Sequence, residues 1–370
     1  MGHATDCRWM ARALQLAERG LYSTSPNPRV GCVLVKDDEI VGEGWHVLAG
    51  EPHAEVYALR EAGEAARGAT AYVTLEPCSH FGRTPPCADA LIEAGVARVV
   101  VAMQDPNPLV SGRGLARLAA AGIAVESGLM ESAARELNVG FATRMTSGLP
   151  WVRSKIAASL DGRTALKNGV SQWITGPEAR RDVQHWRARS CVVLTGIDTV
   201  LADDPRLNVR DLETARQPWR AVADSALRLP PKALLLSGGR VLVYTANDDA
   251  DKRAALEQRG ATVVYLPGAD GRVDLAAMLR DLAQRGMNEV LIEAGATLNG
   301  ALLRAGLIDE LVLYLAPQLL GNAARGLADL GALTELAQRV ELVWQDVRPV
   351  GRDLRIAARV KKEATCSVAS

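Results

Sequence analysis

The sequence predicts a protein of two α/β domains, and three observations support this fold class. The chain has 370 residues, which is more than one hydrophobic core usually organises. Short apolar stretches typical of strands alternate with stretches in which apolar residues recur at helical spacing. A break containing Gly148 and Pro150 separates two such series. We therefore expect two layered α/β domains, over residues 1–147 and 148–370.

The first series predicts a sheet covered by helices on both faces, because its strands are almost wholly apolar. Asp37 and Asp38 form the turn between the first two strands, as short acidic side chains favour turns. The strands are expected at 29–35, 40–45, 70–75, 97–102 and 123–126, and the helices at 54–66, 87–94, 113–121 and 131–145.

The second series repeats this alternation. Two short strands, near Val347 and over residues 354–358, are expected to form a terminal hairpin. The other strands are expected at 151–157, 191–195, 220–223, 241–244, 262–266, 290–292 and 311–315. The helices are expected at 177–189, 249–258, 275–285 and 296–305.

Charge and composition favour a small-molecule substrate over nucleic acid. The net charge is zero, but residues 1–150 hold 13 basic and 17 acidic residues, so 13 − 17 = −4. An acidic first domain has the wrong sign to follow a phosphate backbone. Aromatic residues make up only 4% of the chain, too few for a platform that stacks bases.

The sequence carries no mark of secretion or membrane insertion. The N-terminus lacks a charged segment followed by an apolar one, and no apolar run approaches membrane-spanning length. Six cysteines without a secretion signal indicate a reducing compartment, so we expect a cytoplasmic protein. Cys7, Cys32, Cys191 and Cys366 have no ligand partners nearby and are expected to be core or surface thiols.

A zinc site is predicted by His53, Cys78 and Cys87. One imidazole and two thiolates are three of the four ligands of a tetrahedral zinc ion, which leaves one position for water. Glu55 is close enough in sequence to His53 to move protons for that water. We expect His53 and Glu55 at the start of one helix and Cys78 just before another, whose N-terminus favours a thiolate. These parts are those of a zinc deaminase.

Three other interpretations remain open. Residues 79–86 separate the two thiolates, whereas nucleic-acid deaminases usually carry P-C-x-x-C. A structural zinc site with His80 as fourth ligand is one alternative, although Glu55 would have no purpose there. The second is a tRNA-editing adenosine deaminase, which a basic groove and the short spacing would favour. The third is a zinc-stabilised binding module without enzymatic activity.

The second half lacks the familiar nucleotide-binding motifs. No G-x-G-x-x-G follows a predicted strand, and there is no Walker A lysine. Residues 290–301 (VLIEAGATLNGA) instead run from a strand through a glycine-bearing turn into a helix. Backbone N–H groups at such a helix start are able to hold a pyrophosphate, although the same pattern also fits an ordinary turn.

Taken together, these motifs resemble the bifunctional deaminase/reductase family of riboflavin biosynthesis. The matching segments are 25–31 (SPNPRVG), 53–55 (HAE), 77–87 (PCSHFGRTPPC), 105–108 (DPNP), 159–163 (SLDGR), 171–175 (SQWIT) and 199–205 (TVLADDP). The long insert between Cys78 and Cys87 is that family's own spacing. The resemblance spans residues 5–360 and implies a cytidine-deaminase-like three-layer first domain and a dihydrofolate-reductase-like second domain.

The resemblance also implies roles for individual residues. In the first domain, substrate contacts are implied for Asn27, His46, Asp105 and Asn107, with His80, Arg83 and Thr84 near the ribose phosphate. In the second, NADPH contacts are implied for Ala157, Trp173, Thr199, Asp203, Ser225, Gly295, Ala296, Thr297, Leu298, Asn299, Gly300 and Ala301. Substrate contacts there are implied for Ser171, Arg187, Leu207, Arg210 and Glu293. The two arginines suit a phosphate, and Glu293 suits ribose hydroxyls or a protonation step.

The implied activity has two steps. With one zinc ion per chain, the first domain hydrolytically deaminates 2,5-diamino-6-ribosylamino-4(3H)-pyrimidinone 5′-phosphate. The second then transfers a hydride from NADPH to C1′ of the ribosyl group, which becomes a ribityl chain. The expected partner is this small phosphorylated pyrimidine, with neither nucleic acid nor membrane, and we expect a homo-oligomer, either a dimer or a tetramer.

Overall fold

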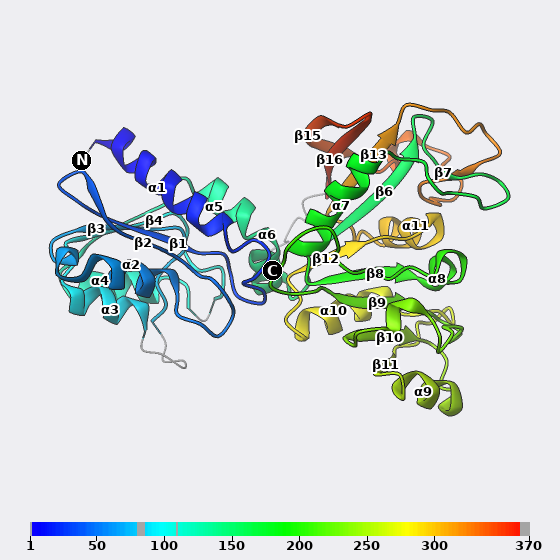
Figure 1. The fold of residues 1–370 in the computed structure, drawn as a ribbon, viewed down its shortest axis with the longest axis horizontal. Coiled ribbons are helices and arrows are strands. Elements are labelled where there is room, and N and C mark those ends of the chain that lie inside the picture. Colours follow the sequence, from blue (N-terminus) through cyan, green and yellow to red (C-terminus); the bar gives the residue numbers. More distant parts are fainter. Residues whose placement is uncertain (1, 80–85, 109, 363–370) are drawn as a thin grey trace, which may run out of the picture. The chain divides into compact units, whose positions relative to one another are not determined.

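The protein consists of two compact units, Met1–Leu149 and Pro150–Ser370, shown in Figure 1. The structure is a computed structural model that describes residues 2–79, 86–108 and 110–362. Each unit has its own main sheet. Within the described residues, no helix combines the length and the apolar character needed to cross a membrane.

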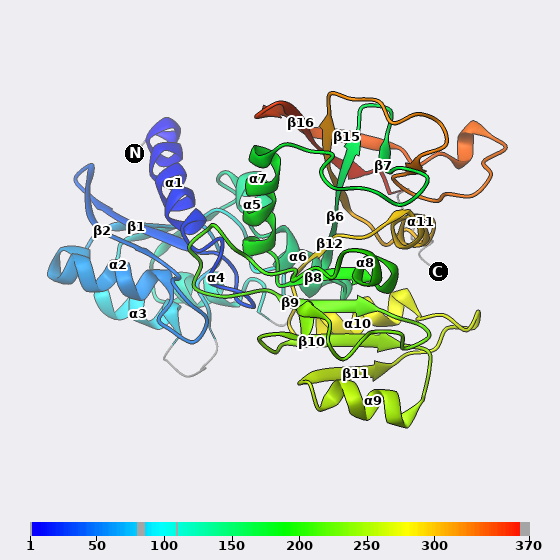
Figure 2. The same ribbon diagram turned by 45° about the vertical axis from the view of Figure 1, so that its right-hand side comes forward.

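The first unit is a five-stranded sheet between two helical layers, with strand order β2-β1-β3-β4-β5. Strand β1 pairs antiparallel with β2 and β3, whereas β3, β4 and β5 run parallel. Helices α1 and α5 lie on one side of the sheet, and α2, α3 and α4 lie on the other (Figures 1 and 2). The strands are β1 (Gly31–Lys36), β2 (Glu39–Trp45), β3 (Thr70–Val73), β4 (Arg98–Val101) and β5 (Ala124–Ser127). The helices are α1 (His3–Glu18), α2 (Ala54–Ala62), α3 (Cys87–Ala94), α4 (Arg113–Ala120), α5 (Glu131–Leu137) and α6 (Val139–Ser147).

Packing of α2 against β2 places the residues predicted to bind zinc. A Cβ atom on Gly44 of β2 would lie only 2.3 Å from the carbonyl oxygen of Ala54, so the first turn of α2 packs directly on the strand. His53 immediately precedes this turn and Glu55 lies within it. The small residue in β2 therefore sets the depth of both side chains.

One helix of this unit was not predicted, and two predicted helices differ from the structure. Helix α1 was not predicted, because Gly2 at its start offers no capping side chain. The helix predicted over 54–66 ends at Ala62 and continues as a 3₁₀ turn, Gly63–Ala66. The helix predicted over 131–145 is two helices separated by Asn138, whose side-chain amide bonds both the N–H and the C=O of Arg29.

The second unit is built on a nine-stranded sheet with strand order β11-β10-β9-β8-β12-β6-β13-β16-β15. From β11 to β13 neighbouring strands are parallel, and β16 and β15 add an antiparallel hairpin. The strands are β6 (Trp151–Ser159), β8 (Val192–Gly196), β9 (Trp219–Ala223), β10 (Val241–Thr245), β11 (Ala261–Tyr265), β12 (Glu289–Ile292), β13 (Glu310–Ala316), β15 (Leu342–Val350) and β16 (Asp353–Val360). A separate small pair joins β7 (Arg163–Ala165) to β14 (Arg325–Gly326).

Helices connect the parallel strands of this sheet. They are α7 (Pro177–Arg189), α8 (Ile197–Asp203), α9 (Ala250–Glu257), α10 (Leu275–Gln284) and α11 (Ala296–Arg304). Short 3₁₀ turns occur at Leu234–Leu236 and Leu336–Gln338. Helix α8 was not predicted as an element. It follows directly after β8, and α11 follows β12, so both helices begin at the carboxyl ends of adjacent parallel strands, where α/β proteins usually bind ligands.

Candidate active sites

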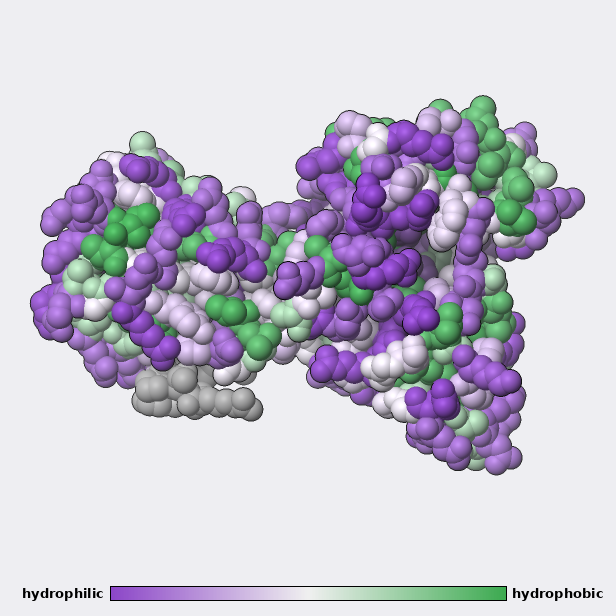
Figure 3. All heavy atoms as spheres, viewed as in Figure 1, coloured by the Kyte–Doolittle hydropathy of each residue, from purple (hydrophilic) through white to green (hydrophobic). Residues whose placement is uncertain are grey.

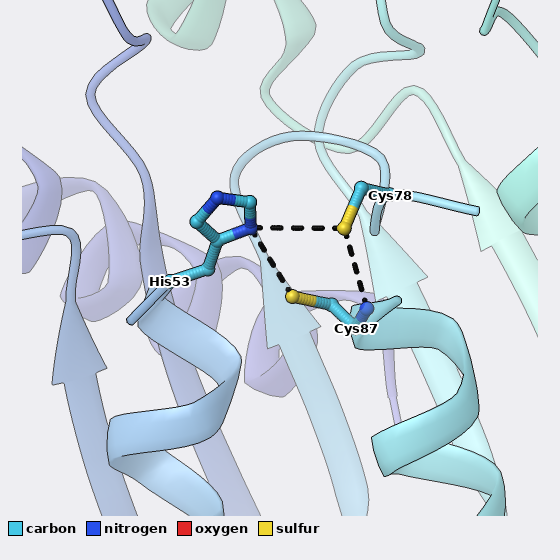
Figure 4. A group of neighbouring side chains, drawn as sticks. All are labelled: His53, Cys78 and Cys87. Carbon is cyan, nitrogen blue, oxygen red and sulfur yellow. Dashed lines mark hydrogen bonds between the residues drawn. The ribbon is translucent and has the colours of Figure 1, made fainter. Parts of the chain in front are cut away.

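His53, Cys78 and Cys87 form a compact group of potential metal ligands in the first unit (Figure 4). His53 is the N-cap of α2, Cys87 is the first residue of α3, and Cys78 lies in the segment that follows β3. The Nδ1 atom of His53 is 3.7 Å from Sγ of Cys78 and 3.3 Å from Sγ of Cys87. In a tetrahedral zinc site these ligand atoms are about 3.6 Å apart, so the residues present fit a zinc ion.

The start of α3 stabilises a thiolate on Cys78. The helix begins only at Cys87, later in the sequence than the segment holding Cys78, yet the backbone N–H of Cys87 donates to Sγ of Cys78 at 3.3 Å. The Cys87 thiol, together with His53 and this N–H, lowers the pKa of Cys78 to about 4. The N-terminus of α3 thus contacts Cys78 through a backbone N–H, although nine positions separate the two cysteines.

Glu55 is a buried carboxyl group beside these ligands. Only 3% of the residue is exposed, and its Oε2 atom has no hydrogen-bond partner among the described residues. Burial, reinforced by the charge of Cys78 and opposed by that of His53, raises the pKa of Glu55 to about 7. A carboxyl group with a pKa near neutrality can both accept and return a proton. The buried Oε2 atom without a partner is also free to accept a hydrogen bond from a reacting water molecule.

Asn27 and His46 are joined to this site by direct contacts. The side-chain amide of Asn27 donates to Nε2 of His46 at 3.0 Å, and Nδ1 of His46 donates to the carbonyl oxygen of Pro52 at 3.1 Å. Burial lowers the pKa of His46, consistent with a neutral ring in this tautomer. The rings of His46 and His53 meet edge to face, with centroids 5.4 Å apart. The structure thus brings two predicted substrate residues beside the predicted zinc ligands.

Asp105 and Asn107 lie in a loop that follows β4 and leads towards α4. The Asp105 carboxylate accepts the backbone N–H of Asn107 at 2.8 Å, and the backbone N–H of Asp105 donates to Glu76 at 3.0 Å. Glu76 was not singled out in the sequence, although it lies two positions before Cys78. His80, Arg83 and Thr84 lie outside the described residues.

The other cysteines do not join the ligand group. Cys32 and Cys191 are buried thiols, and Cys7 is partly exposed, as predicted for core or surface thiols. Cys366 lies outside the described residues. Within the part of the chain that the structure describes, the cluster of His53, Cys78 and Cys87 is the group positioned to hold a metal ion.

A large cavity in the second unit lies where β8, β9 and β12 end. Its volume is about 860 Å³, and its wall includes the start of α11, which follows β12. Arg228, Arg272 and Arg304 also line it and provide positive charge of the kind that binds phosphate groups. The predicted cofactor residues in its wall are Thr199, Ser225, Gly295, Thr297, Leu298 and Ala301.

Three predicted cofactor residues of α11 are not in the wall of this cavity. Ala296 accepts a hydrogen bond from the backbone of Asp329, and Gly300 packs against that same residue. The side chain of Asn299 is buried, bonding Ser154 at 2.9 Å and the carbonyl oxygens of Ala294 and Leu327. These three residues hold the helix in place rather than face the cavity.

A second cavity, of about 450 Å³, adjoins the first, and Thr199 lines both. Trp173 is 64% exposed, so it is not a core residue, and the guanidinium carbon of Arg180 lies 4.6 Å from its ring centroid. The predicted residues in this wall are Ala157, Ser171, Trp173, Thr199, Asp203, Arg187, Leu207, Arg210 and Glu293.

A buried charge cluster forms one wall of the second cavity. Arg187 binds Glu293 through both of its carboxylate oxygens, and Nζ of Lys155 lies 3.7 Å from Oε2 of Glu293. Burial alone would raise the pKa of Glu293, but Arg187 and Lys155 outweigh it and lower that pKa to about 2. Burial, with Arg187 adding to it, lowers the pKa of Lys155.

This cluster revises two expectations for the second half. Arg187 was expected to suit a phosphate, but one edge of its guanidinium is occupied by Glu293. Because Glu293 is ionised at neutral pH, it accepts hydrogen bonds from hydroxyl groups rather than donating a proton. Lys155 was missed, although a lysine inside the apolar strand predicted over 151–157 is itself an unusual feature.

Known protein families match both units. Residues 3–103 match the cytidine and deoxycytidylate deaminase zinc-binding region, and residues 150–355 match the RibD C-terminal domain. The first match covers the predicted zinc ligands, and the second covers both cavities. The predicted fold class, a cytidine-deaminase-like domain followed by a reductase domain, is confirmed by these matches.

Similar proteins extend over nearly the whole chain. The riboflavin biosynthesis protein RibD of Escherichia coli is 54% identical over 362 residues, covering 94% of this chain and 98% of that protein. The corresponding protein of Haemophilus influenzae is 48% identical, with 95% and 96% covered. The solved structure of Acinetobacter baumannii RibD has a TM-score of 0.91 at 50% identity, covering 98% of this chain and all of the other. A diaminohydroxyphosphoribosylaminopyrimidine deaminase/reductase structure from Thermotoga maritima has a TM-score of 0.87 at 33% identity, with 97% and 99% covered.

Proposed function

The chain belongs to the RibD family of bifunctional deaminase/reductases in riboflavin biosynthesis, and from this premise we propose which residues perform each reaction. The first unit removes the ring amino group of 2,5-diamino-6-ribosylamino-4(3H)-pyrimidinone 5′-phosphate. The second reduces the ribosyl group of the product to ribityl. The family membership leaves no support for the two rival classes, a tRNA-editing enzyme and a binding module without activity.

The observation that carries the deaminase assignment is the buried carboxyl of Glu55 beside three ligands for one metal ion. A zinc ion held by His53, Cys78 and Cys87 would activate a water molecule at this position. Glu55 is proposed to accept a proton as the oxygen of that water bonds the ring carbon. It then gives this proton to the amino group, whose bond to the same carbon breaks as ammonia leaves. The near-neutral pKa of Glu55 supports both halves of this transfer.

Asn27 and His46 are proposed to bind the pyrimidine. The bond between them orients the Asn27 amide, and the neutral ring of His46 has its own orientation set by the carbonyl oxygen of Pro52. Asp105 and Asn107 are proposed to bind the same substrate from the loop after β4, where the Asp105 carboxylate bonds the Asn107 backbone. Groups held in this way bind a planar ring without a large loss of side-chain entropy.

The reductase site is proposed to occupy the two adjoining cavities. NADPH supplies the hydride, and the larger cavity suits it because its wall includes the start of α11 and three arginines. The smaller cavity takes the substrate, with Glu293 accepting hydrogen bonds from ribose hydroxyls. When C1′ accepts the hydride, the bond between C1′ and the oxygen of the ribose ring breaks. We propose that Lys155 gives this ribose oxygen a proton. Its lowered pKa supports this role.

We also propose that the chain works in the cytoplasm as a homo-oligomer. Cys78 and Cys87 must remain reduced to bind zinc, which favours a reducing compartment. Figure 3 shows a surface that is mostly hydrophilic on the face drawn, with hydrophobic side chains in small groups. Val343, Trp344 and Val347 on the terminal strand β15 are 48%, 61% and 53% exposed, and such an edge strand supports self-association. Light scattering after gel filtration tests the oligomeric state.

The decisive experiment measures turnover of the diaminopyrimidine with and without NADPH. Without NADPH, ammonia should be released and the deaminated ribosylamino compound should accumulate. With NADPH, the ribitylamino compound should replace it as NADPH is oxidised. Absence of ammonia would refute the deaminase assignment, and failure to oxidise NADPH with the deaminated compound supplied would refute the reductase assignment.

A further inference from the structure

Glu76 is a buried carboxylate in the first unit to which neither the sequence motifs nor the reaction assigns a role. It follows the end of β3 and precedes Pro77 and Cys78, and only 4% of the residue is exposed. Its own backbone N–H donates to the carbonyl oxygen of Met103 at 3.0 Å, which attaches this segment to the chain just beyond β4. Among the described residues Glu76 forms no ion pair, so its burial must be offset by the hydrogen bonds that it accepts.

Both oxygens of Glu76 accept backbone N–H groups, one from the loop after β4 and three from the start of α4. Oε2 accepts from Asp105 at 3.0 Å and from Gly112 at 2.9 Å. Oε1 accepts from Gly114 at 2.8 Å and from Leu115 at 3.4 Å. One carboxylate therefore connects Asp105, in the loop after β4, to the first turn of α4. Charged hydrogen bonds of this kind are among the stronger ones in proteins.

The packing around Gly114 shows how tightly the loop is held. A Cβ atom at this position would lie 2.0 Å from the carbonyl oxygen of Pro77 and 3.2 Å from Oε1 of Glu76. No larger residue fits without moving one of the two segments. The backbone that leads into Cys78 and the end of the substrate loop thus lie in direct contact, with Glu76 between them.

The hydrogen bonds continue from Glu76 to two of the proposed substrate residues. Glu76 bonds the backbone of Asp105, and the side chain of Asp105 bonds the backbone of Asn107. In the other direction along the chain, Cys78 is only two residues from Glu76. The same carboxylate thus links the segment of a zinc ligand to the loop that carries the substrate residues.

We propose that Glu76 is a positioning residue of the deaminase, which sets the distance between the zinc ligands and the substrate residues Asp105 and Asn107 in the loop after β4. This proposal rests on the proposed deaminase function. Glu76 acts through the backbone of Asp105 rather than on the reacting atoms, so it should govern substrate binding more than the chemical step. The carboxylate is required because only a group with two acceptor oxygens can take all four N–H groups.

The test compares Glu76→Gln with Glu61→Gln. The amide of glutamine keeps one acceptor oxygen and turns an NH₂ group towards two N–H donors, so half of the loop contacts are lost. Glu61 is the matched control, because its carboxylate also accepts one backbone N–H, from Glu43 at 2.7 Å, but lies on the exposed surface away from this loop. Glu76→Asp, with the same charge and a shorter reach, is a second variant.

Four quantities are measured on the full-length zinc-loaded chain. They are zinc per chain, KM and kcat for ammonia release, the NADPH-dependent rate with the deaminated substrate supplied, and hydrogen exchange of the Asp105, Gly112 and Gly114 amides. For Glu76→Gln we expect KM to rise roughly tenfold to a hundredfold, as for a small misplacement of binding groups, with a smaller change in kcat. The three amides should exchange faster, while zinc content and reductase rate stay unchanged. Glu76→Asp should show a smaller rise in KM, and Glu61→Gln should match wild type.

Two results would overturn the proposal. One is an unchanged KM with unchanged amide exchange, and the other is loss of zinc from Glu76→Gln, which would make the residue a support of the metal site alone. Failure of the proposed function has a different signature, because wild type itself would then release no ammonia. The exchange measurement would still show in that case whether Glu76 holds the loop.

Discussion

Arg187 binds Glu293 through two parallel hydrogen bonds, from Nε to Oε1 at 2.6 Å and from Nη2 to Oε2 at 2.9 Å. The side chains are 10% and 11% exposed, so the pair is largely withdrawn from water. Arg187 comes from α7, whereas Glu293 follows β12 at the carboxyl edge of the sheet. Because both residues line the smaller cavity, this ion pair forms part of the charged wall that a substrate meets there.

Removing the arginine of this pair should disable the reductase. In Arg187→Ala, Glu293 loses its two hydrogen bonds from Arg187 and keeps the charges of Lys155 and Arg210, so its pKa should rise and the cavity should lose its shape. Breaking a buried pair in this way costs about 3–5 kcal/mol. We expect a large fall in NADPH oxidation with the deaminated substrate, while ammonia release by the same protein is retained. Arg181→Ala is the control, because Arg181 lies on the same helix, is 65% exposed and pairs with nearby Glu178. Normal reductase activity in Arg187→Ala would contradict the assignment.

Glu55→Gln should separate metal binding from catalysis in the first unit. The substitution preserves the shape of the side chain but removes the group that accepts a proton, an effect of about 10²–10⁴-fold on rate. Zinc content should stay at the wild-type value, because the ligands His53, Cys78 and Cys87 are untouched. Ammonia release and bound zinc are the two measurements, with the exposed Glu61→Gln on the same helix as control. Ammonia release at the wild-type rate would refute the proposed role of Glu55.

Removal of zinc should abolish one activity and spare the other. A chelator should strip the ion from His53, Cys78 and Cys87 and stop ammonia release, and added zinc should restore it. NADPH oxidation with the deaminated substrate should continue, because both cavities are built from residues of the second unit. Acidic pH should favour stripping, since protons compete for imidazole and thiolate ligands. If chelation halts both reactions equally, the proposed division of labour fails.

Asp6 should make the stability of the first unit depend on acid. Arg98 donates to both oxygens of Asp6 at 2.9 Å, and these bonds, helped by Tyr72, lower the pKa of Asp6 to about 2. In an unfolded chain the pKa of aspartate is about 3.9, so the bonds stabilise the fold above that pH. This contribution is lost as the pH falls from about 4 to about 2.

Asp6→Asn should therefore lower the free energy of unfolding of the first unit by about 2 kcal/mol at neutral pH. It should also flatten the dependence of stability on pH between about 4 and 2. Both effects are measured by unfolding in denaturant, with hydrogen exchange of the β3 amides as the probe. Glu131→Gln, which removes an exposed ion pair, is the control. An unchanged pH dependence in Asp6→Asn would show that another carboxylate is responsible.

Much of the architecture follows from local patterns in the sequence. Helices α3 and α7 begin and end where apolar spacing and the preceding prolines or glycines indicate. Helix α1 was missed because its signal lies in a buried face that includes Trp9, Met10 and Ala13, without a capping residue at the start. The predicted helix over 131–145 is divided because the Asn138 side chain hydrogen-bonds the backbone of Arg29. The spacing of apolar residues around Asn138 does not indicate this contact.

The metal site could be predicted from the sequence for a chemical reason. Imidazole and thiolate are scarce side chains with strong preferences for zinc, and His53 and Cys87 occupy the starts of helices that local patterns also predict. The roles of Glu76 and Lys155 were not accessible in this way. The roles of Glu76, which precedes a proline, and of Lys155, which lies in a strand, can be assigned only when the residues that they contact are known.

By itself, the sequence determined the alternation of strands and helices and the residues able to bind zinc, since both depend on neighbouring residues and intrinsic chemistry. The tertiary structure decided that Arg187 pairs with Glu293 and that Glu293 is ionised beside Lys155. It also decided that Glu76 hydrogen-bonds the backbone between β4 and α4. Arg187 and Glu293 are 106 positions apart in the chain. Their meeting depends on strand order, and the charge of a carboxyl group depends on the burial and the cations that only the folded chain provides.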